Sequence, residues 1–432
     1  MTAAERVSAP ACPFSHGMPF DPRSLLAADD PEPWFSLARE HSPVFYVPEL
    51  QVWYITRYAD VVTVLKDTQR FSSRRANRFK PITSSVLRDV YPDGHPGLHS
   101  MLLKDPPEHS RVRRLVAKAF TPTMVAAMHP FITQTCERLV ADFASEGTCD
   151  LLSQFSSKLP TEVMTDLAGA TDVPGIDLAT WGEDYFALIE GAPPISSERE
   201  EALAARANTM LSWLSQHIDS KRENPGDDLI SALLGATTPE GDPSLTTKEV
   251  IAVLSSMMSA GIETTSIYIP EVLSYLLRHP GLWQRMIDDP SARQRLLDEG
   301  LRIVTPARGV RRTTTCPVTI AGVHIPEGDD VFISFRSANY DETVFPDAST
   351  FEIDRDNADR HLSFGRGTHF CIGQSLAKLE IATAFDTIIE ALPDLRVAAG
   401  GDYEWLPNAM MPRPTRLQLE WDATRVPERF RK

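Results

Sequence analysis

The sequence predicts a mainly α-helical protein with small β-sheets near both ends of the chain. From about residue 107 to residue 300, apolar residues recur at spacings of three and four, which is typical of amphipathic helices. Runs with β character lie within residues 42–63 and 310–335, and another, TRLQLEW, lies near the C-terminus. Because no Pro-, Gly- or Ser-rich linker separates these parts, we expect one domain over residues 1–432, in which residues 1–20 form an N-terminal tail.

The predicted elements follow one another in a simple order. The runs VFYV and VWYIT predict two short strands, and a helix follows from Tyr58 to Lys66. Strands return in PVTI, GVHIP and DVFISF, with Gly322 and Gly328 in the turns between them. A helix is then expected at about 371–391, before the last strand.

The longest predicted helix opens with a capping box, in which Thr246 is the N-cap and Glu249 the third helical residue. It can run to Arg278, a length of roughly 48 Å, so it must cross the interior. Its middle reads AGIETT over residues 260–265, where a glycine, a carboxylate and two hydroxyl groups are poor choices for core packing. Such a conflict in the core points to function, and Pro270 further on predicts a kink.

Composition limits the classes of function. The 432 residues carry 59 acidic and 43 basic side chains, a formal net charge of −16, which argues against binding to nucleic acid or membrane surfaces. No unbroken run of about 18 apolar residues predicts a transmembrane helix, and the N-terminal residues do not resemble a secretory signal. The five cysteines are scattered without a CxxC pair, so we expect no disulfide framework and a reducing, cytoplasmic location.

One cysteine has a distinctive setting, in the stretch HLSFGRGTHFCIG at residues 361–373. Gly365 and Gly367 predict a tight loop with positive φ, and Cys371 stands at the start of the following helix, where N–H groups favour a thiolate. A thiolate held in this way suits the iron of a heme, and Phe364 can exclude water from the sulfur. The alternative for a lone cysteine is a small buried apolar residue.

The ten residues from Phe364 to Gly373, FGRGTHFCIG, resemble the heme-binding signature of the cytochrome P-450 family, FGxGxHxCxG, at every fixed position. The resemblance extends from about residue 20 to the C-terminus. It implies the fold of that family, an α-rich core around heme b with a minor β lobe, and a heme-thiolate monooxygenase. In it Phe364, Gly365, Cys371 and Gly373 would contact the heme, with Cys371 as the axial ligand of the iron.

The same resemblance assigns roles to charged residues elsewhere. Glu299 and Arg302 match the ExxR helix, which in the family is buried and locks onto an arginine, here Arg355. Residues matching the partners of the heme propionates are His109, Arg113, Arg312 and His361. Taken one at a time, each basic residue could be a solvated surface charge, but unpaired propionates would be costly inside a protein.

The AGIETT segment resembles the oxygen-activating segment of the family. Ala260 and Gly261 would lie at the heme, Thr264 would hydrogen-bond dioxygen, and Glu263 would feed protons from solvent. The alternative is that Thr264 only bonds the carbonyl of Ala260 and bends the helix.

By the same resemblance, the substrate is a mainly apolar small molecule. Arg308, with three arginines at positions 74, 75 and 78, hints at an anionic group on that substrate, although Arg308 could instead assist a propionate. The residues expected to line the pocket are Phe79, Leu98, Phe186, Val304, Arg308, Met410 and Met411.

Partners follow from the same comparison. The chain carries no flavin- or ferredoxin-like extension, so we expect a monomer that takes electrons from a separate ferredoxin or flavodoxin with its reductase, and that also binds O2. An acidic carrier would meet a local basic patch, unless these side chains only serve solubility. The residues expected in the patch are Arg111, Arg114, Lys118, Arg366 and Lys378.

Three rival functions stay open. A peroxide-driven peroxygenase would use the same heme and thiolate, although Glu263 and Thr264 argue against it. A non-catalytic heme sensor would normally need an output domain, and none is visible. A reactive-cysteine enzyme without heme would purify as a colourless protein.

Overall fold

The computed structural model describes residues 32–76, 84–92, 94, 96–169, 184, 188, 196–238, 241–401, 405–406 and 410–432. Its helices are α2 (Glu32–His41), α3 (Tyr58–Lys66), α4 (Ser85–Val90), α5 (Glu108–Ala119), α6 (Pro122–Ala127), α7 (His129–Ala141), α8 (Lys158–Leu167), α10 (Ser197–Glu223), α11 (Leu229–Gly235), α12 (Thr247–Arg278), α13 (Pro280–Asp288), α14 (Arg293–Val304), α15 (Phe335–Asn339) and α16 (Gln374–Ala391). Its strands are β1 (Val44–Val47), β2 (Val52–Ile55), β3 (Phe71–Ser72), β4 (Thr148–Asp150), β5 (Gly309–Thr314), β6 (Val318–Ile320), β7 (Val323–Ile325), β8 (Asp330–Ser334), β9 (Arg396–Val397), β10 (Trp405–Leu406), β11 (Arg413–Pro414) and β12 (Gln418–Glu420).

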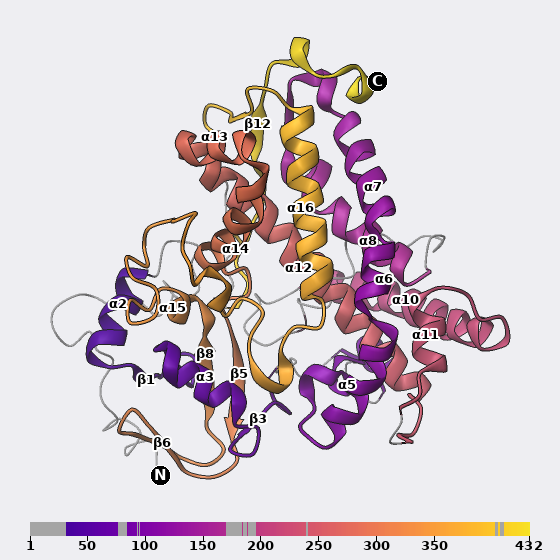
Figure 1. The fold of residues 1–432 in the computed structure, drawn as a ribbon. Helices are drawn as coiled ribbons and strands as arrows, with labels where there is room; N and C mark the ends of the chain where they lie inside the picture. The colour runs from indigo at the N-terminus through magenta and orange to yellow at the C-terminus, as the bar shows by residue number, and fades with distance from the viewer. Residues whose placement is uncertain are drawn as a thin grey trace.

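A five-stranded sheet in the order β1-β2-β8-β5-β3 lies at the lower left of Figure 1. β2 and β8 run parallel, with Trp53 opposite Val331, and the other neighbouring strands are antiparallel. All residues of β8 are buried, as a central strand requires. The sheet joins the two β regions at 44–55 and 309–334, so the predicted class, mainly α with small sheets, is confirmed.

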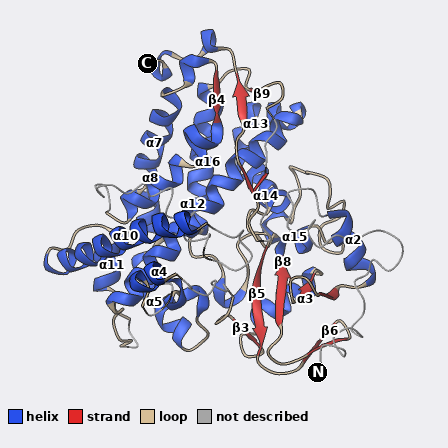
Figure 2. Cartoon of the chain, turned by 180° about the vertical axis from the view of Figure 1, so that it is seen from behind, coloured by secondary structure: helices blue, strands red, loops and turns tan. Residues whose placement is uncertain are grey.

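Helices fill the rest of the molecule, and the view from behind shows the larger sheet confined to one side (Figure 2). A large apolar cluster extends through the helices and one part of the sheet. A smaller cluster joins α2 to the sheet, where Phe35 of α2 packs with Tyr54 and Phe332.

The long central helix, α12, has the predicted limits. The hydroxyl of Thr246 accepts the N–H of Glu249, and the carboxylate of Glu249 accepts the N–H of Thr246, which completes the capping box. The helix continues through Pro270 and ends at Arg278, 32 residues in all, so the proline does not end it. In Figure 1 it passes behind α16 through the middle of the molecule.

By length and mean hydropathy, α12 meets the requirement for a membrane span, although its sequence contains no unbroken run of about 18 apolar residues. Of its most apolar window, 72% is buried inside the molecule. The bent pair Glu108–Ala127 and His129–Glu146 meets the same requirement only if it is counted as one span. The apolar residues of α12 therefore serve the protein core.

Candidate functional site

The loop before α16 has the backbone that its glycines predict. Gly365 and Gly367 have φ values of 67° and 72°, which L side chains rarely adopt. A Cβ atom on Gly367 would lie 2.7 Å from the carbonyl oxygen of Leu65, so α3 leaves no room for a side chain there. The N–H of Cys371 donates to the carbonyl of Phe364 at 2.9 Å and closes the loop. The loop therefore presents Cys371 directly ahead of α16.

The sulfur of Cys371 experiences opposing influences. Burial raises the pKa of the thiol, while the N–H groups of Gly373 and Gln374 and the charge of Arg113 lower it. The net shift is upward, so the donors of the chain do not by themselves offset burial, in contrast to the stabilised thiolate that the sequence predicts. Cys371 is nevertheless exposed at the surface that the described residues form. A metal cation bound there would supply the missing stabilisation of the thiolate.

Three basic side chains lie together near Cys371. His109 is 1% exposed, and neither of its ring nitrogens has a hydrogen-bond partner among the described residues. Burial and the charges of Arg113 and Arg312 lower the pKa of His109 to about 4. Burial also lowers the pKa of Arg312 to about 10.

These basic groups have few partners. Arg312 is buried, and the only hydrogen bond of its side chain in the described part of the chain goes to the carbonyl of Arg311, at 2.7 Å. The side chain of Arg113 is half-buried and makes no hydrogen bond or ion pair within the described ranges. Buried cations without an anion are costly, so this group is suited to a ligand that carries negative charge.

Two further histidines complete the polar part of the site. The ring of His369 packs against that of His109 at a centroid distance of 4.2 Å, and its Nε2 lies 3.0 Å from Oγ of Ser73. His361 is buried, and its Nδ1 accepts the N–H of Ser363 at 3.2 Å. Burial lowers the pKa of His369 to about 2 and that of His361 to about 3, so both are neutral in the protein.

Together these residues fit a heme. Cys371 offers the sulfur donor that heme iron accepts. Arg113 and Arg312 offer the positive charge that two propionates need, and the neutral ring of His109 offers a hydrogen bond. The centre of the Phe364 ring lies 5.6 Å from that of the His361 ring. Among the described residues, no group of three or more His, Cys, Asp or Glu side chains could hold a bare metal ion.

The middle of α12 is accessible on one face although most of the helix is buried. Ala260 is exposed, Gly261 and Thr264 are partly exposed, and their spacing places them on the same side of the helix. A Cβ atom on Gly261 would lie 2.9 Å from the sulfur of Met164 in α8. The close packing of α8 therefore gives a reason for this glycine besides its expected place at the heme.

The two residues predicted to activate oxygen are both engaged within the protein. The hydroxyl of Thr264 donates to the carbonyl of Ala260 at 2.7 Å, which is the geometry of the structural alternative. Its oxygen can still accept a hydrogen bond while it donates one. The carboxylate of Glu263 lies 3.5 Å from Nη1 of Arg413 in β11.

Glu299, Arg302 and Arg355 form one buried network. Arg302 donates to both carboxylate oxygens of Glu299, at 2.7 and 2.9 Å, and Arg355 donates to the same carboxylate at 3.0 Å. Arg302 also donates to the carbonyls of Asn339 and Ala348, at 2.8 and 2.7 Å. The network therefore ties α14 to α15 and to the chain around residues 346–355.

The residues predicted to line a substrate pocket are spread over several elements. Phe79 and Phe186 lie outside the described residues. Leu98 is 44% exposed on the short helix η3 (Pro96–His99), which packs against α12. It is therefore at the surface rather than enclosed.

Arg308 and the two methionines near the C-terminus lie closer together. The N–H of Arg308 donates to the carbonyl of Met410 at 2.8 Å. The side chain of Met410 packs against the smaller apolar cluster, and Met411 is partly exposed. The structure thus joins Arg308 to the C-terminal segment.

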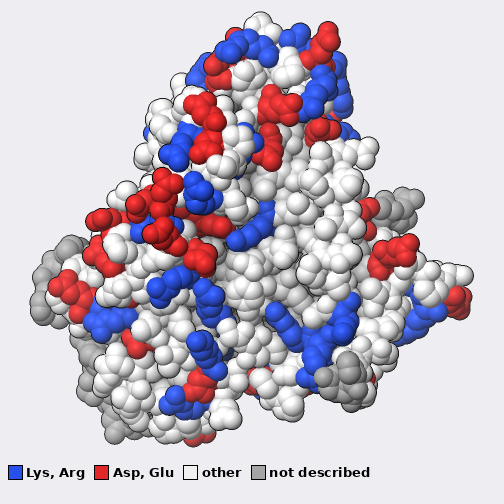
Figure 3. Space-filling view, in the orientation of Figure 1, with Lys and Arg blue, Asp and Glu red and all other residues white. Residues whose placement is uncertain are grey.

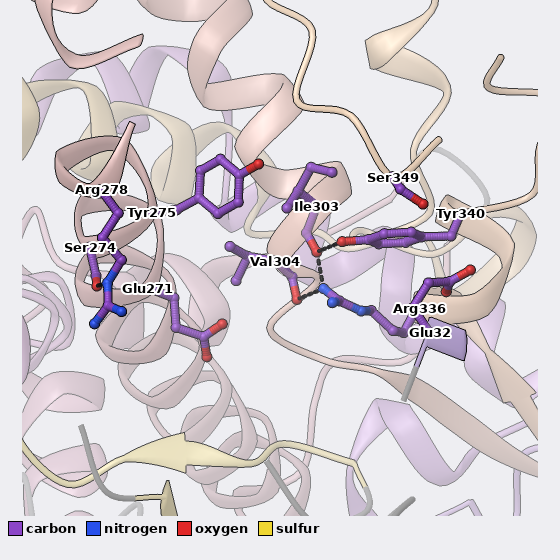
Figure 4. A pocket seen from close by; sticks show the side chains of 10 residues that line it. All are labelled: Glu32, Glu271, Ser274, Tyr275, Arg278, Ile303, Val304, Arg336, Tyr340 and Ser349. Carbon is purple, nitrogen blue, oxygen red and sulfur yellow. Dashed lines mark hydrogen bonds between the residues drawn. The ribbon is translucent and has the colours of Figure 1, made fainter. Parts of the chain in front are cut away.

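Val304 lines a cavity of about 480 Å³ between α12, α14, α15 and α2 (Figure 4). The carboxyl of Glu271 points into this space from α12, and Arg336 lies across from it beside Tyr340. Burial raises the pKa of Glu271 to about 8, against the opposing charges of Arg308 and Arg336. Cys371 and its basic neighbours do not line this cavity.

The predicted basic patch is partly neutralised. Arg111 pairs with Glu249, Arg114 with Asp242 at 2.8 Å, and Lys378 with Asp298 at 2.7 Å. No acidic partner is present for Lys118 or Arg366 among the described residues. Lys and Arg side chains still gather in the lower half of the face in Figure 3, around α3 and α5, whereas Asp and Glu gather near α14 and α15.

Sequence analysis did not identify Arg413 or Asp105 as parts of the site. Asp105 accepts the N–H of Ser73 at 2.7 Å and acts electrostatically on Arg312. No spacing in the sequence links Arg413 to Glu263, because β11 reaches α12 only through the tertiary fold. The one available signal was a charge directly after the apolar residues at 410–412.

A helical fold with a cysteine at the start of α16 and a buried basic group beside it defines a heme-thiolate protein. A family model described as Cytochrome P450 matches residues 184–290 and 293–393. The chain belongs to the cytochrome P450 family and is a P450 monooxygenase.

Individual relatives support this assignment along most of the chain. The chain is 36% identical to Cytochrome P450 107B1 of Saccharopolyspora erythraea over 369 residues, 84% of this chain and 87% of that one. It is 33% identical to Cytochrome P450 monooxygenase PikC of Streptomyces venezuelae, over 91% of this chain and 92% of PikC. The solved structure of cytochrome P450 CREJ in complex with (4-ethylphenyl) dihydrogen phosphate has a TM-score of 0.83 at 29% identity, over 94% of this chain and all of that one.

Proposed function

We propose that the chain binds heme b with Cys371 as the axial ligand and inserts one atom of O2 into a mainly apolar small molecule. The observation that carries this proposal is the buried group of His109, Arg113 and Arg312 beside Cys371, which has few partners in the chain and matches the charge of two propionates. His361, which is neutral, would donate a hydrogen bond to the propionates.

The heme, when bound, supplies the redox chemistry that activates dioxygen, and the thiolate favours cleavage of the O–O bond. The chain supplies orientation, exclusion of water and protons. Phe364 shields the sulfur, and Gly365 and Gly373 permit the close approach of the loop. Glu263 takes up a proton from solvent and passes it on, and the oxygen of Thr264, whose hydroxyl proton is donated to Ala260, accepts a hydrogen bond at the reacting oxygen.

We infer that the substrate carries an anionic group beside its apolar part. Arg308 is fixed by its backbone to Met410, and the relative CREJ is described in complex with an aryl phosphate. A comparison of paired ligands tests this inference: 4-ethylphenyl phosphate and 4-ethylphenol, each titrated against wild type and Arg308→Gln. A selective loss of phosphate affinity in the variant is expected, and equal affinities in both proteins would contradict it.

Electrons come, in this proposal, from a separate ferredoxin or flavodoxin with its reductase, in the cytoplasm, to a monomeric enzyme organised as one domain. Lys118 and Arg366 support the docking of an acidic carrier, because neither has an acidic partner among the described residues.

The decisive experiment is the spectrum of the reduced protein under carbon monoxide. Wild type is expected to show the Soret band of a thiolate-ligated heme, and Cys371→Ala is expected to lose it while Cys136→Ala keeps it. A colourless wild type would indicate the cysteine enzyme without heme. Turnover with hydrogen peroxide alone would favour the peroxygenase, and a heme protein without any turnover would favour the sensor.

A further inference from the structure

The acid at the centre of α12 has a cationic partner from a distant part of the sequence. Nη1 of Arg413 lies 3.5 Å from Oε1 of Glu263. The side chain of Glu263 is 12% exposed and that of Arg413 is 30% exposed, so water screens this pair only in part. Glu263 therefore occupies the core as half of an ion pair.

Arg413 is held where the C-terminal hairpin meets α12. β11 pairs with β10 so that Arg413 lies opposite Leu406, and β11 packs against α12. The carbonyl of Met410, three residues earlier, accepts the N–H of Arg308 at 2.8 Å. These backbone contacts fix the place of β11 beside α12, and therefore the point from which the side chain of Arg413 extends.

A guanidinium at this distance favours the ionised form of a carboxyl group. A group that relays protons works best when its proton affinity suits the working pH, so an arginine that holds the carboxylate ionised controls how readily it takes up a proton. The other elements that pack against α12 also carry charged or titratable groups, which include Lys158, Glu162 and Asp166 on α8, His99 on η3, Arg206 and His217 on α10, Arg285 on α13, Glu299 and Arg302 on α14, Glu380 on α16 and Arg396 on β9. The charge of Arg413 pairs directly with Glu263.

We propose that Arg413 is a positioning residue that holds Glu263 in its ionised, paired form and thereby sets the proton affinity of this carboxyl group. An effect of Arg413 on turnover rests on the proposed function, in which Glu263 is the proton relay. The pairing and its effect on ionisation belong to the resting protein.

The first test is a double-mutant cycle of Arg413→Gln and Glu263→Gln, measured by urea unfolding of the heme-loaded protein without turnover. If the two residues act as a pair, Glu263→Gln changes the unfolding equilibrium constant of Arg413→Gln by a factor at least threefold smaller than the factor by which it changes that of wild type. Arg416→Gln, which removes an exposed charge three residues away, is expected to be additive with Glu263→Gln. Additivity for Arg413→Gln as well would overturn the proposal.

The second test follows the infrared C=O band of a protonated carboxyl group, assigned to Glu263 by its absence in Glu263→Gln. In Arg413→Gln the band is expected to titrate at least one pH unit higher than in wild type, a tenfold change in proton affinity. Arg413→Lys is expected to restore most of the wild-type midpoint, and Arg416→Gln to leave it unchanged. Equal titration midpoints in wild type and Arg413→Gln would overturn the proposal, even if Arg413→Gln is less stable than wild type. Failure of monooxygenase turnover affects neither test, so the two proposals can fail separately.

Discussion

At the scale of single residues, the protein keeps several ionisable groups in surroundings that oppose their charge. Glu380 in α16 is 2% exposed, and one of its carboxylate oxygens has no hydrogen-bond partner among the described residues. Burial raises its pKa to about 8, and Glu271 beside the cavity has a similar value. Such carboxyl groups are protonated near neutral pH, which avoids a buried charge.

Glu380 therefore predicts a fall in stability with rising pH. Its pKa in the folded protein, about 8, is above the ordinary value of 4.5, so the folded state holds a proton that the unfolded state has released between these values. The contribution to stability is complete below pH 4.5 and is lost as pH rises toward 8, by roughly 1.4 kcal/mol per pH unit.

Glu380→Gln is expected to remove this slope and to be more stable than wild type at pH 8. Urea unfolding at a series of pH values measures how the stability of each protein changes with pH. Glu390→Gln, an exposed change on the same helix, is the control and is expected to keep the slope. Parallel pH curves for wild type and Glu380→Gln would show that this carboxyl group does not cause the effect.

Thr264 gives a second prediction at this scale. If its hydroxyl holds the reacting oxygen, Thr264→Ala keeps heme content and substrate affinity, while reductant consumption yields less product and severalfold more free hydrogen peroxide. If its bond to Ala260, at 2.7 Å, only shapes the helix, the variant changes stability and not the ratio of product to reductant. Measurement of that ratio with a substrate found by spin-shift screening decides between the two.

At the scale of elements, the buried carboxylate of Glu299 joins α14 to the chain around Arg355. Glu299→Gln would leave two guanidinium groups in the core without their anion, and removal of one partner of a buried pair typically costs about 3–5 kcal/mol. Urea unfolding is expected to show a loss of this size. Glu352→Gln is the matched control, because Glu352 approaches the same Arg355 at 3.6 Å but is 55% exposed. A loss in Glu352→Gln as large as in Glu299→Gln would contradict the argument.

Elements whose signals are local were predictable from the sequence. The capping box at Thr246, the limits of α12 and the positive φ of Gly365 and Gly367 are all encoded within a few residues, and the structure has them. The partners of Glu263 and Arg111 were not predictable, because Arg413 and Glu249 meet them only through packing of distant elements. The net pKa of Cys371 likewise depends on burial, which no local pattern reports.

At the scale of the whole molecule, the uneven distribution of charge matters more than the total. The chain has a net charge of −16, yet Lys and Arg side chains gather around α3 and α5 on the face shown in Figure 3. An acidic electron carrier is repelled by the molecule as a whole and attracted by this region, so the attraction also orients it. The ion pairs of Arg111 and Arg114 reduce their share of this attraction.

This distribution yields a graded prediction for reduction by a ferredoxin. Lys118→Glu is expected to slow reduction more than Arg114→Glu, because Asp242 already offsets the charge of Arg114 while Lys118 is exposed and has no acidic partner among the described residues. Stopped-flow measurements at increasing salt concentration give the rate of reduction of each protein. The wild-type rate should fall with salt, since attraction is screened over about 8 Å at physiological ionic strength. The difference in rate between wild type and Lys118→Glu should shrink in parallel, because the salt dependence and this difference both reflect association.

Arg416→Glu carries the same charge change on the C-terminal segment and should leave the rate near wild type. A rate independent of salt, or equal slowing by Lys118→Glu and Arg416→Glu, would exclude docking of the carrier on this face.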